Sequence, residues 1–160
     1  MKKFVTPAAL ALSALVAHSD PVVRVDDPWV RTTVPEQTAT GAYMTITSSA
    51  GGKLVSVTSP VASAVEVHEM KMDGDVMRMR TVDALALPKA QKVELKPGAY
   101  HLMLLGLKHP VNSGDVIPLA LVVQDADGKS RIVEVSAPAR GPKTNPPKAT
   151  TMPPPVKTAP

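Results

Sequence analysis

Apolar and polar side chains alternate through most of the chain, and Gly, Pro, Asp and Asn separate the alternating segments. This period of two is typical of β-strands that bury one face, because successive side chains of a strand point to opposite faces. None of the windows repeats apolar residues with the period of a long amphipathic helix. The pattern therefore predicts strands over residues 28–32, 41–48, 53–59, 64–72, 75–82, 92–95, 99–105, 116–124 and 130–136.

Short strands at this spacing predict an all-β domain, an antiparallel β-sandwich or barrel with Greek-key connections. A chain of 160 residues is long enough for one such domain with additional segments at its ends. We expect the domain to span residues 20–137. The order of the strands in the sheet cannot be read from the pattern.

The two ends of the chain differ from this body. Lys2 and Lys3 precede an apolar stretch over residues 4–17, which is typical of a secretory signal peptide, and we expect that peptide to be residues 1–19. The stretch is shorter than the roughly 20 residues that span a bilayer. We therefore expect an exported chain without a transmembrane segment after cleavage. Residues 138–160 hold eight of the 17 prolines and no long apolar run, which predicts a disordered, basic tail.

The basic residues are concentrated at the two ends. The whole chain carries a formal charge of +4, but residues 20–137 hold 12 basic and 14 acidic side chains, a net charge of −2. Aromatic residues make up 2% of the chain, too few for the platforms on which proteins stack nucleobases. Charge and composition together argue against a nucleic-acid-binding domain.

The sequence contains no cysteine, which excludes disulfides, thiolate metal sites and cysteine nucleophiles. It also excludes a blue-copper electron carrier, whose trigonal site needs a cysteine thiolate. The serine-hydrolase elbow and the His-Glu-x-x-His metalloprotease motif are absent as well. We therefore expect no enzyme activity, and any soft metal ligand must be methionine.

A methionine-rich segment over residues 64–82 contains a strong hairpin signal. Asp73-Gly74 favours a two-residue turn, because a type I′ turn needs positive φ at both central positions. The resulting register predicts four cross-strand pairs: His68 with Met79, Glu69 with Arg78, Met70 with Met77, and Met72 with Asp75. Because side chains alternate along a strand, one face then carries His68, Met70, Met77 and Met79.

A second histidine and methionine lie two residues apart at His101 and Met103, so a strand points both to the same face. If this strand comes near the hairpin, two imidazoles and two thioethers form one pocket with His68 and Met79. Neutral thioether sulfur is soft and favours Cu(I), whereas zinc and calcium sites normally recruit thiolates or carboxylates. The donor set therefore indicates a Cu(I) site.

The spacing of these four residues, His68-x10-Met79-x21-His101-x-Met103, resembles the signature of the PCuAC family of periplasmic copper chaperones. The resemblance extends over roughly residues 22–137. The surrounding residues that also match are Trp29 to Arg31, Thr40 to Met44, Val67 to Arg80 and Lys96 to Leu107.

This resemblance implies a cupredoxin-like β-barrel in which His68, Met79, His101 and Met103 bind Cu(I). It also implies a periplasmic, monomeric protein that delivers copper to the CuA centre of cytochrome c oxidase. Delivery would be direct to the CuA subunit or through a thiol-containing partner chaperone.

Two other functions remain open at this stage. The same pocket would serve periplasmic copper storage or resistance, because storage and delivery need the same ligands. Alternatively, the chain is a secreted β-sandwich interaction module without metal, in which the methionines form an adaptable protein-binding patch. We expect Met70 and Met77 to be a hydrophobic surround of the site or accessory thioethers, Met72 to be exposed, and Trp29 to anchor the core.

Overall fold

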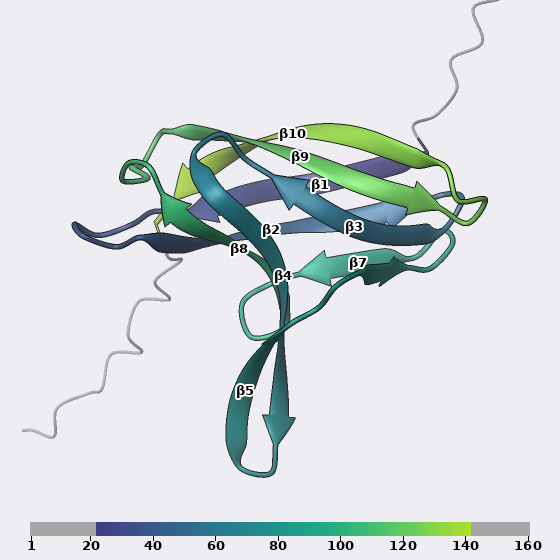
Figure 1. The fold of residues 1–160 in the computed structure, drawn as a ribbon, viewed down its shortest axis with the longest axis horizontal. Coiled ribbons are helices and arrows are strands. Elements are labelled where there is room, and N and C mark those ends of the chain that lie inside the picture. Colours follow the sequence, from purple (N-terminus) through teal and green to yellow (C-terminus); the bar gives the residue numbers. More distant parts are fainter. Residues whose placement is uncertain (1–21, 142–160) are drawn as a thin grey trace, which may run out of the picture.

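The structure is a computed structural model that describes residues 22–141, and its regular elements are all β-strands (Figure 1). The ten strands are β1 (Val23–Arg31), β2 (Ala39–Ser48), β3 (Gly52–Thr58), β4 (Ala62–Asp73), β5 (Val76–Thr81), β6 (Leu85–Leu87), β7 (Lys92–Leu95), β8 (Tyr100–Leu107), β9 (Val116–Asp125) and β10 (Ser130–Arg140). The predicted all-β class is confirmed.

Seven of the strands close into a barrel in the order β4-β8-β2-β1-β10-β9-β3, and β3 returns to β4 through the pair Val57 and Val65. The chain crosses between strands that are not neighbours from β2 to β3 and from β8 to β9, as in a Greek key. All pairings around the barrel are antiparallel except β1 with β10, which are parallel. The predicted antiparallel barrel with Greek-key connections is therefore present, with this one parallel pairing.

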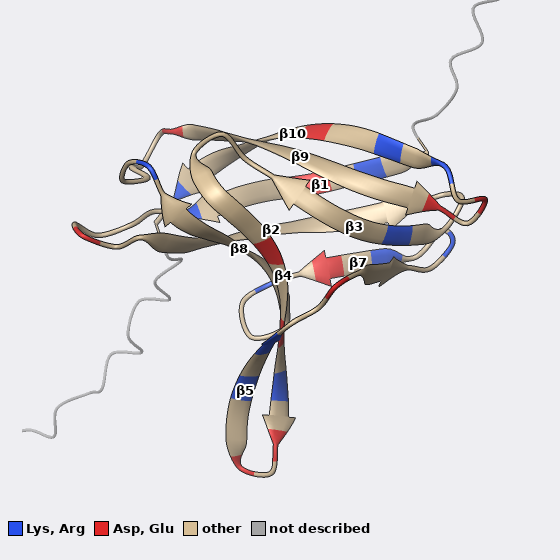
Figure 2. Ribbon diagram, viewed as in Figure 1, with Lys and Arg blue, Asp and Glu red and all other residues tan. Residues whose placement is uncertain are grey.

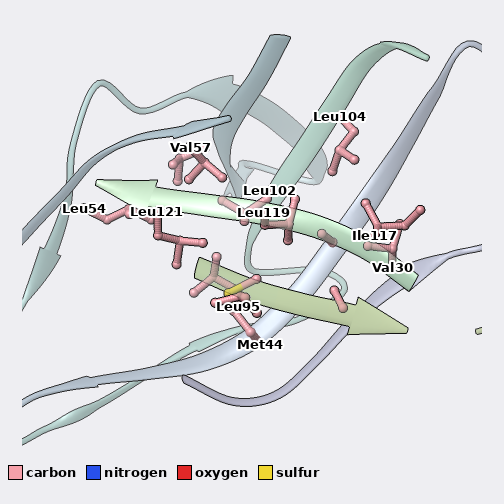
Figure 3. Packing of buried hydrophobic residues seen from close by; sticks show 14 of the residues in the cluster. Val30, Met44, Leu54, Val57, Leu95, Leu102, Leu104, Ile117, Leu119 and Leu121 are labelled. Atoms are coloured by element: carbon pink, nitrogen blue, oxygen red, sulfur yellow. The ribbon is translucent and has the colours of Figure 1, made fainter. Parts of the chain in front are cut away.

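The barrel interior is filled by aliphatic side chains from every strand of the ring (Figure 3). Strand β8 shows the principle. Leu102 and Leu104 are fully buried, whereas the alternate residues His101 and Met103 point to the outer face. Burying a leucine side chain contributes roughly 1.5–3 kcal/mol, so the same alternation that stabilises the barrel presents a histidine and a methionine on its outside.

Three strands lie outside the ring: β5 pairs only with β4, β6 with β3, and β7 with β2. The β4–β5 hairpin projects beyond the barrel, as the lower arm in Figure 1. The last pair between β4 and β8 is Glu69 with Tyr100. Beyond it, the two strands of the hairpin pair only with each other over residues 70–79. Every residue of β5 is exposed.

Two strand predictions need correction. Strand β1 begins at Val23 rather than residue 28, because Asp26-Asp27-Pro28 forms a β-bulge with positive φ at Asp27 instead of ending the strand. Strand β6 is not predicted, because three residues are too few to show an alternating pattern.

The domain extends three residues past the predicted boundary at residue 137. Ala139 is buried, and it pairs with Val30 of β1 because β10 continues alongside that strand. Pro138 does not stop the strand, and Arg140 forms an ion pair with Asp27 at 3.0 Å. The predicted signal peptide and residues 142–160 of the predicted tail lie outside the described residues.

Within residues 22–141, no helix is long and apolar enough to cross a membrane.

Candidate metal centre

The hairpin turn differs by one residue from the prediction. Gly74 and Asp75 are its central residues, Asp73 pairs with Val76, and positive φ occurs at Gly74 but not at Asp73 or Asp75. Glycine at the first central position with positive φ there alone is the φ pattern of a type II′ turn, not the expected type I′. The predicted cross-strand pairs are therefore wrong.

The observed pairs are His68 with Thr81, Glu69 with Arg80, Met70 with Met79, and Met72 with Met77. The partners have moved by two positions, and an even displacement leaves every side chain on its original face. One face therefore still carries the histidine and the methionines, as the alternation predicts. Strand β8 joins this face because His68 pairs directly with His101.

His68 and Met79 are in direct contact, with Nδ1 of His68 3.0 Å from Sδ of Met79. On the other side of the ring, Nε2 lies 2.8 Å from Oε2 of Glu66. Because an ionised carboxylate only accepts hydrogen bonds, Nε2 donates this one, and in the neutral imidazole that tautomer leaves the Nδ1 lone pair on the side of the thioether. The hydrogen bond from His68 lowers the pKa of Glu66, which keeps that carboxylate ionised.

His101 presents its other ring nitrogen. The imidazole is 7% exposed, and its Nδ1 donates to the carbonyl oxygen of Ala99 at 3.1 Å, which leaves Nε2 as the free donor atom. The rings of His68 and His101 lie 5.8 Å apart between centroids at 74°. The backbone therefore holds one imidazole and a carboxylate holds the other, and each ring keeps one unprotonated nitrogen.

An open pocket of about 270 Å³ lies beside these rings. Its lining includes Met70, Met79, His101 and Met103, and Met103 reaches it from the β8 position that pairs with Glu66. His68 adjoins the pocket through its contact with Met79. The structure thus brings all four predicted site residues to one outer surface of the barrel.

The pocket has an aromatic wall that the sequence does not reveal. Tyr43 lies between Trp29, at a centroid distance of 4.5 Å, and His101, at 6.4 Å. The guanidinium of Arg31 sits over the Tyr43 ring at 5.8 Å. Gly41 leaves room for this ring, because a Cβ there would lie 2.5 Å from the Tyr43 hydroxyl oxygen. Trp29 therefore supports the outer wall of the site and does not anchor the core as expected.

The base of the hairpin is fixed by a polar network. The Tyr100 hydroxyl donates to Glu69 at 2.9 Å, and Arg80 forms an ion pair with the same carboxylate at 2.9 Å. Tyr100 is the main cause that lowers the pKa of Glu69, with Arg80 second, and Glu69 raises the pKa of Tyr100 in return. Glu69 and Arg80 flank His68 and Met79 in sequence, so this network supports the positions of both.

We expect the Tyr100→Phe variant to unfold at a lower urea concentration than the native chain and to raise the pKa of Glu69. The hydroxyl donor that favours the ionised carboxylate is lost, while the ring stays in place. Carboxyl titration by NMR measures the second effect. Glu94, paired with Lys96 on β7, is the internal reference and keeps its pKa. An unchanged Glu69 titration would show that the network does not exist.

Other singled-out residues lie away from the pocket. Met72 is exposed as expected, and Met77 pairs with it near the hairpin tip, so Met77 does not surround the site. His109 is exposed in the loop after β8, near the Pro110 carbonyl. Among the described residues, no three His, Cys, Asp or Glu side chains cluster as a metal site.

Residues 23–139 match the family described as "Putative lipoprotein LpqE-like", which covers nearly the whole described domain. The chain belongs to the LpqE-like family. Among solved structures, this LpqE-like domain aligns with the "Copper-bound PCuAC domain from PmoF2", with a TM-score of 0.64 and 23% identity over 78% of this chain and 97% of that one.

It also aligns with the "Solution structure of CuI-DR1885 from Deinococcus Radiodurans". The TM-score is 0.61 and the identity 28%, over 79% of this chain and 83% of that one. The resemblance to PCuAC proteins and the predicted cupredoxin-like barrel are confirmed by these alignments.

The chain also matches two curated relatives over part of its length. "Putative lipoprotein Lxx21020" of Leifsonia xyli subsp. xyli (strain CTCB07) is 30% identical over 104 residues, which are 64% of this chain and 63% of the relative. "Uncharacterized protein RP573" of Rickettsia prowazekii (strain Madrid E) is 28% identical over 124 residues, 74% of this chain and 68% of the relative. The match thus spans less than two thirds of Lxx21020.

Proposed function

We propose that this protein binds one Cu(I) ion through Nδ1 of His68, Nε2 of His101 and the sulfur atoms of Met79 and Met103. The observation that carries the proposal is the 3.0 Å approach of His68 Nδ1 to Met79 Sδ. Two such donors on one tetrahedral ion lie about 3.5 Å apart when the bonds are close to 2.0 and 2.3 Å, as at zinc. A small increase in the distance between Nδ1 and Sδ therefore makes room for the ion.

The donor chemistry selects the metal. Imidazole and thioether ligands are both neutral, and the thioether sulfur is soft, so the set suits a monovalent copper ion better than calcium, magnesium or zinc. The nearest carboxylate, Glu66, is already engaged by His68 and Thr81 and supplies charge beside the site. A copper-bound PCuAC domain and a Cu(I) form of DR1885 among the structural neighbours support the same choice.

We propose delivery as the role. Met79 is 50% exposed and the pocket opens to solvent, so an acceptor can replace the ligands one at a time without releasing free copper. The acceptor is the CuA subunit of cytochrome c oxidase or a thiol-containing copper chaperone, and the exported chain acts in the periplasm as a monomer. Ligand exchange makes and breaks no covalent bond of a substrate, so the protein is not an enzyme.

The binding proposal is tested by competition for Cu(I) between the apoprotein and a chromogenic chelator without oxygen. We expect the protein to remove one ion per chain, and X-ray absorption of the complex to show both nitrogen and sulfur neighbours. Retention of all copper by the chelator, or a shell of oxygen alone, would contradict the assignment.

The delivery proposal is tested in cells. A strain that lacks the protein should lose cytochrome c oxidase activity at low copper and regain it when copper is added. Normal oxidase activity combined with sensitivity to high copper would instead identify a storage or resistance protein.

A further inference from the structure

The proposed site takes one ligand, Met79, from the hairpin's two cross-strand methionine pairs. Met70 with Met79 lies at the pocket, and Met72 with Met77 lies one pair farther out, next to the turn. Directly paired residues have Cβ atoms about 4.5–5.5 Å apart, so the flexible thioethers of each pair can reach a common point. The two pairs share the face that holds His68.

The outer pair does not serve packing. Met72 and Met77 are 56% and 52% exposed, and the hairpin projects away from the barrel (Figure 1). Alternation places Lys71, Arg78 and Arg80 on the opposite face of the same hairpin. Figure 2 shows that both strands of the hairpin carry basic positions, drawn in blue. The hairpin thus keeps its solvating charges on one face and places sulfur on the other.

We propose that Met72 and Met77 form a second, weaker Cu(I) site at the hairpin tip, from which the ion passes to the Met70–Met79 pair and into the pocket. The inference rests on the proposed function, because it takes the pocket as the destination. Consecutive pairs on one face are separated by about 6.6 Å along the strand. One ligand exchange therefore spans the gap.

The number and kind of ligands set the direction of this transfer. The tip offers two thioethers, whereas the pocket adds two imidazoles and the nearby charge of Glu66. The two copper–sulfur bonds of the tip break as bonds to Met79 and Met103 form, and the two imidazole nitrogens then add to the ion. Copper remains Cu(I), so the transfer needs no oxidant or proton. The basic residues of the hairpin are matched in number by Glu69, Asp73 and Asp75, so its net charge does not repel the cation.

The test is a titration of the full chain with Cu(I), followed by NMR of the methionine methyl groups under anaerobic conditions. We expect the first equivalent to shift Met79 and Met103 and the second to shift Met72 and Met77. In the Met72→Ile, Met77→Ile double variant, the second step is lost and loading of the pocket from a Cu(I)–chelator complex slows. Val76→Ala removes an exposed apolar side chain from the opposite face of the same tip, and it should load at the native rate.

The outcomes separate the two proposals. Tip methyl groups that stay unshifted at every copper concentration, or native loading kinetics in the double variant, overturn the tip site even if Met79 and Met103 respond. A response at Met72 and Met77 without one at Met79 and Met103 instead overturns the proposed function. Equal slowing in Val76→Ala would show that any change at the tip slows loading, and it would overturn Met72 and Met77 as copper ligands.

Discussion

Replacing Met79 and Met103 together by isoleucine abolishes Cu(I) competition while the barrel stays folded. Two of the four proposed ligands disappear, and the remaining imidazoles do not form a closed soft site. The loss should exceed the roughly 10–100-fold change that follows removal of an outer-shell partner of a metal ligand. Isoleucine suits both strands, and Met79 is 50% exposed, so little packing is lost. Chelator competition measures the affinity, and circular dichroism measures the fold.

A matched control makes the same kind of change on the same two strands. The Val76→Ile, Leu105→Ile double variant alters β5 and β8 outside the proposed ligand set and should compete for Cu(I) as the native chain does. Native affinity in the Met79, Met103 variant would remove both sulfur atoms from the site. Loss of affinity in both variants would point to a general disturbance of the strands.

Replacing Leu102 by alanine lowers the free energy of unfolding by about 2–5 kcal/mol, the usual range for a leucine truncated in a well-packed interior. Leu102 is fully buried, and it lies on β8 between His101 and Met103. The cavity left by the shorter side chain loosens β8, the strand that supplies two of the four proposed ligands. Urea unfolding of the apoprotein measures the loss.

Ile132→Ala is the control for this prediction, because Ile132 is 70% exposed on β10 and should change stability by no more than about 0.5 kcal/mol. Addition of Cu(I) should recover part of the stability lost in Leu102→Ala, because a bound ligand stabilises only the folded state. Equal losses for both variants would mean that the interior shown in Figure 3 does not carry the stability.

The fold was predictable from sequence as far as local alternation determines it. The strand positions and their buried faces follow from a period of two, as β8 illustrates. Closure of the barrel does not follow, because it depends on contacts between residues distant in sequence, such as Val30 with Ala139 and Leu54 with Val123. Nothing local specifies the parallel pairing of β1 with β10.

The site was predictable to a similar extent. Alternation alone places the histidine and methionines of the hairpin on one face, which is why that conclusion survives an incorrect turn. The register depended on whether Asp73 or Asp75 shares the turn with Gly74, and both choices are chemically reasonable. Glu66 was within reach of the same reasoning, because it lies two residues before His68. Tyr43 was not, because its role depends on the pairing of β2 with β8.

The alternation of side chains between the two faces of the hairpin constrains how its length can vary among related sequences. Insertion or deletion of a single residue between His68 and Met79 inverts every later side chain of β5, so that an arginine would occupy the sulfur position. Two residues added to β5 alone preserve the face but move the sulfur one pair along the strand, away from the His68 ring. The hairpin can therefore lengthen without disturbing the site when β4 and β5 gain one residue each beyond the Met70–Met79 pair.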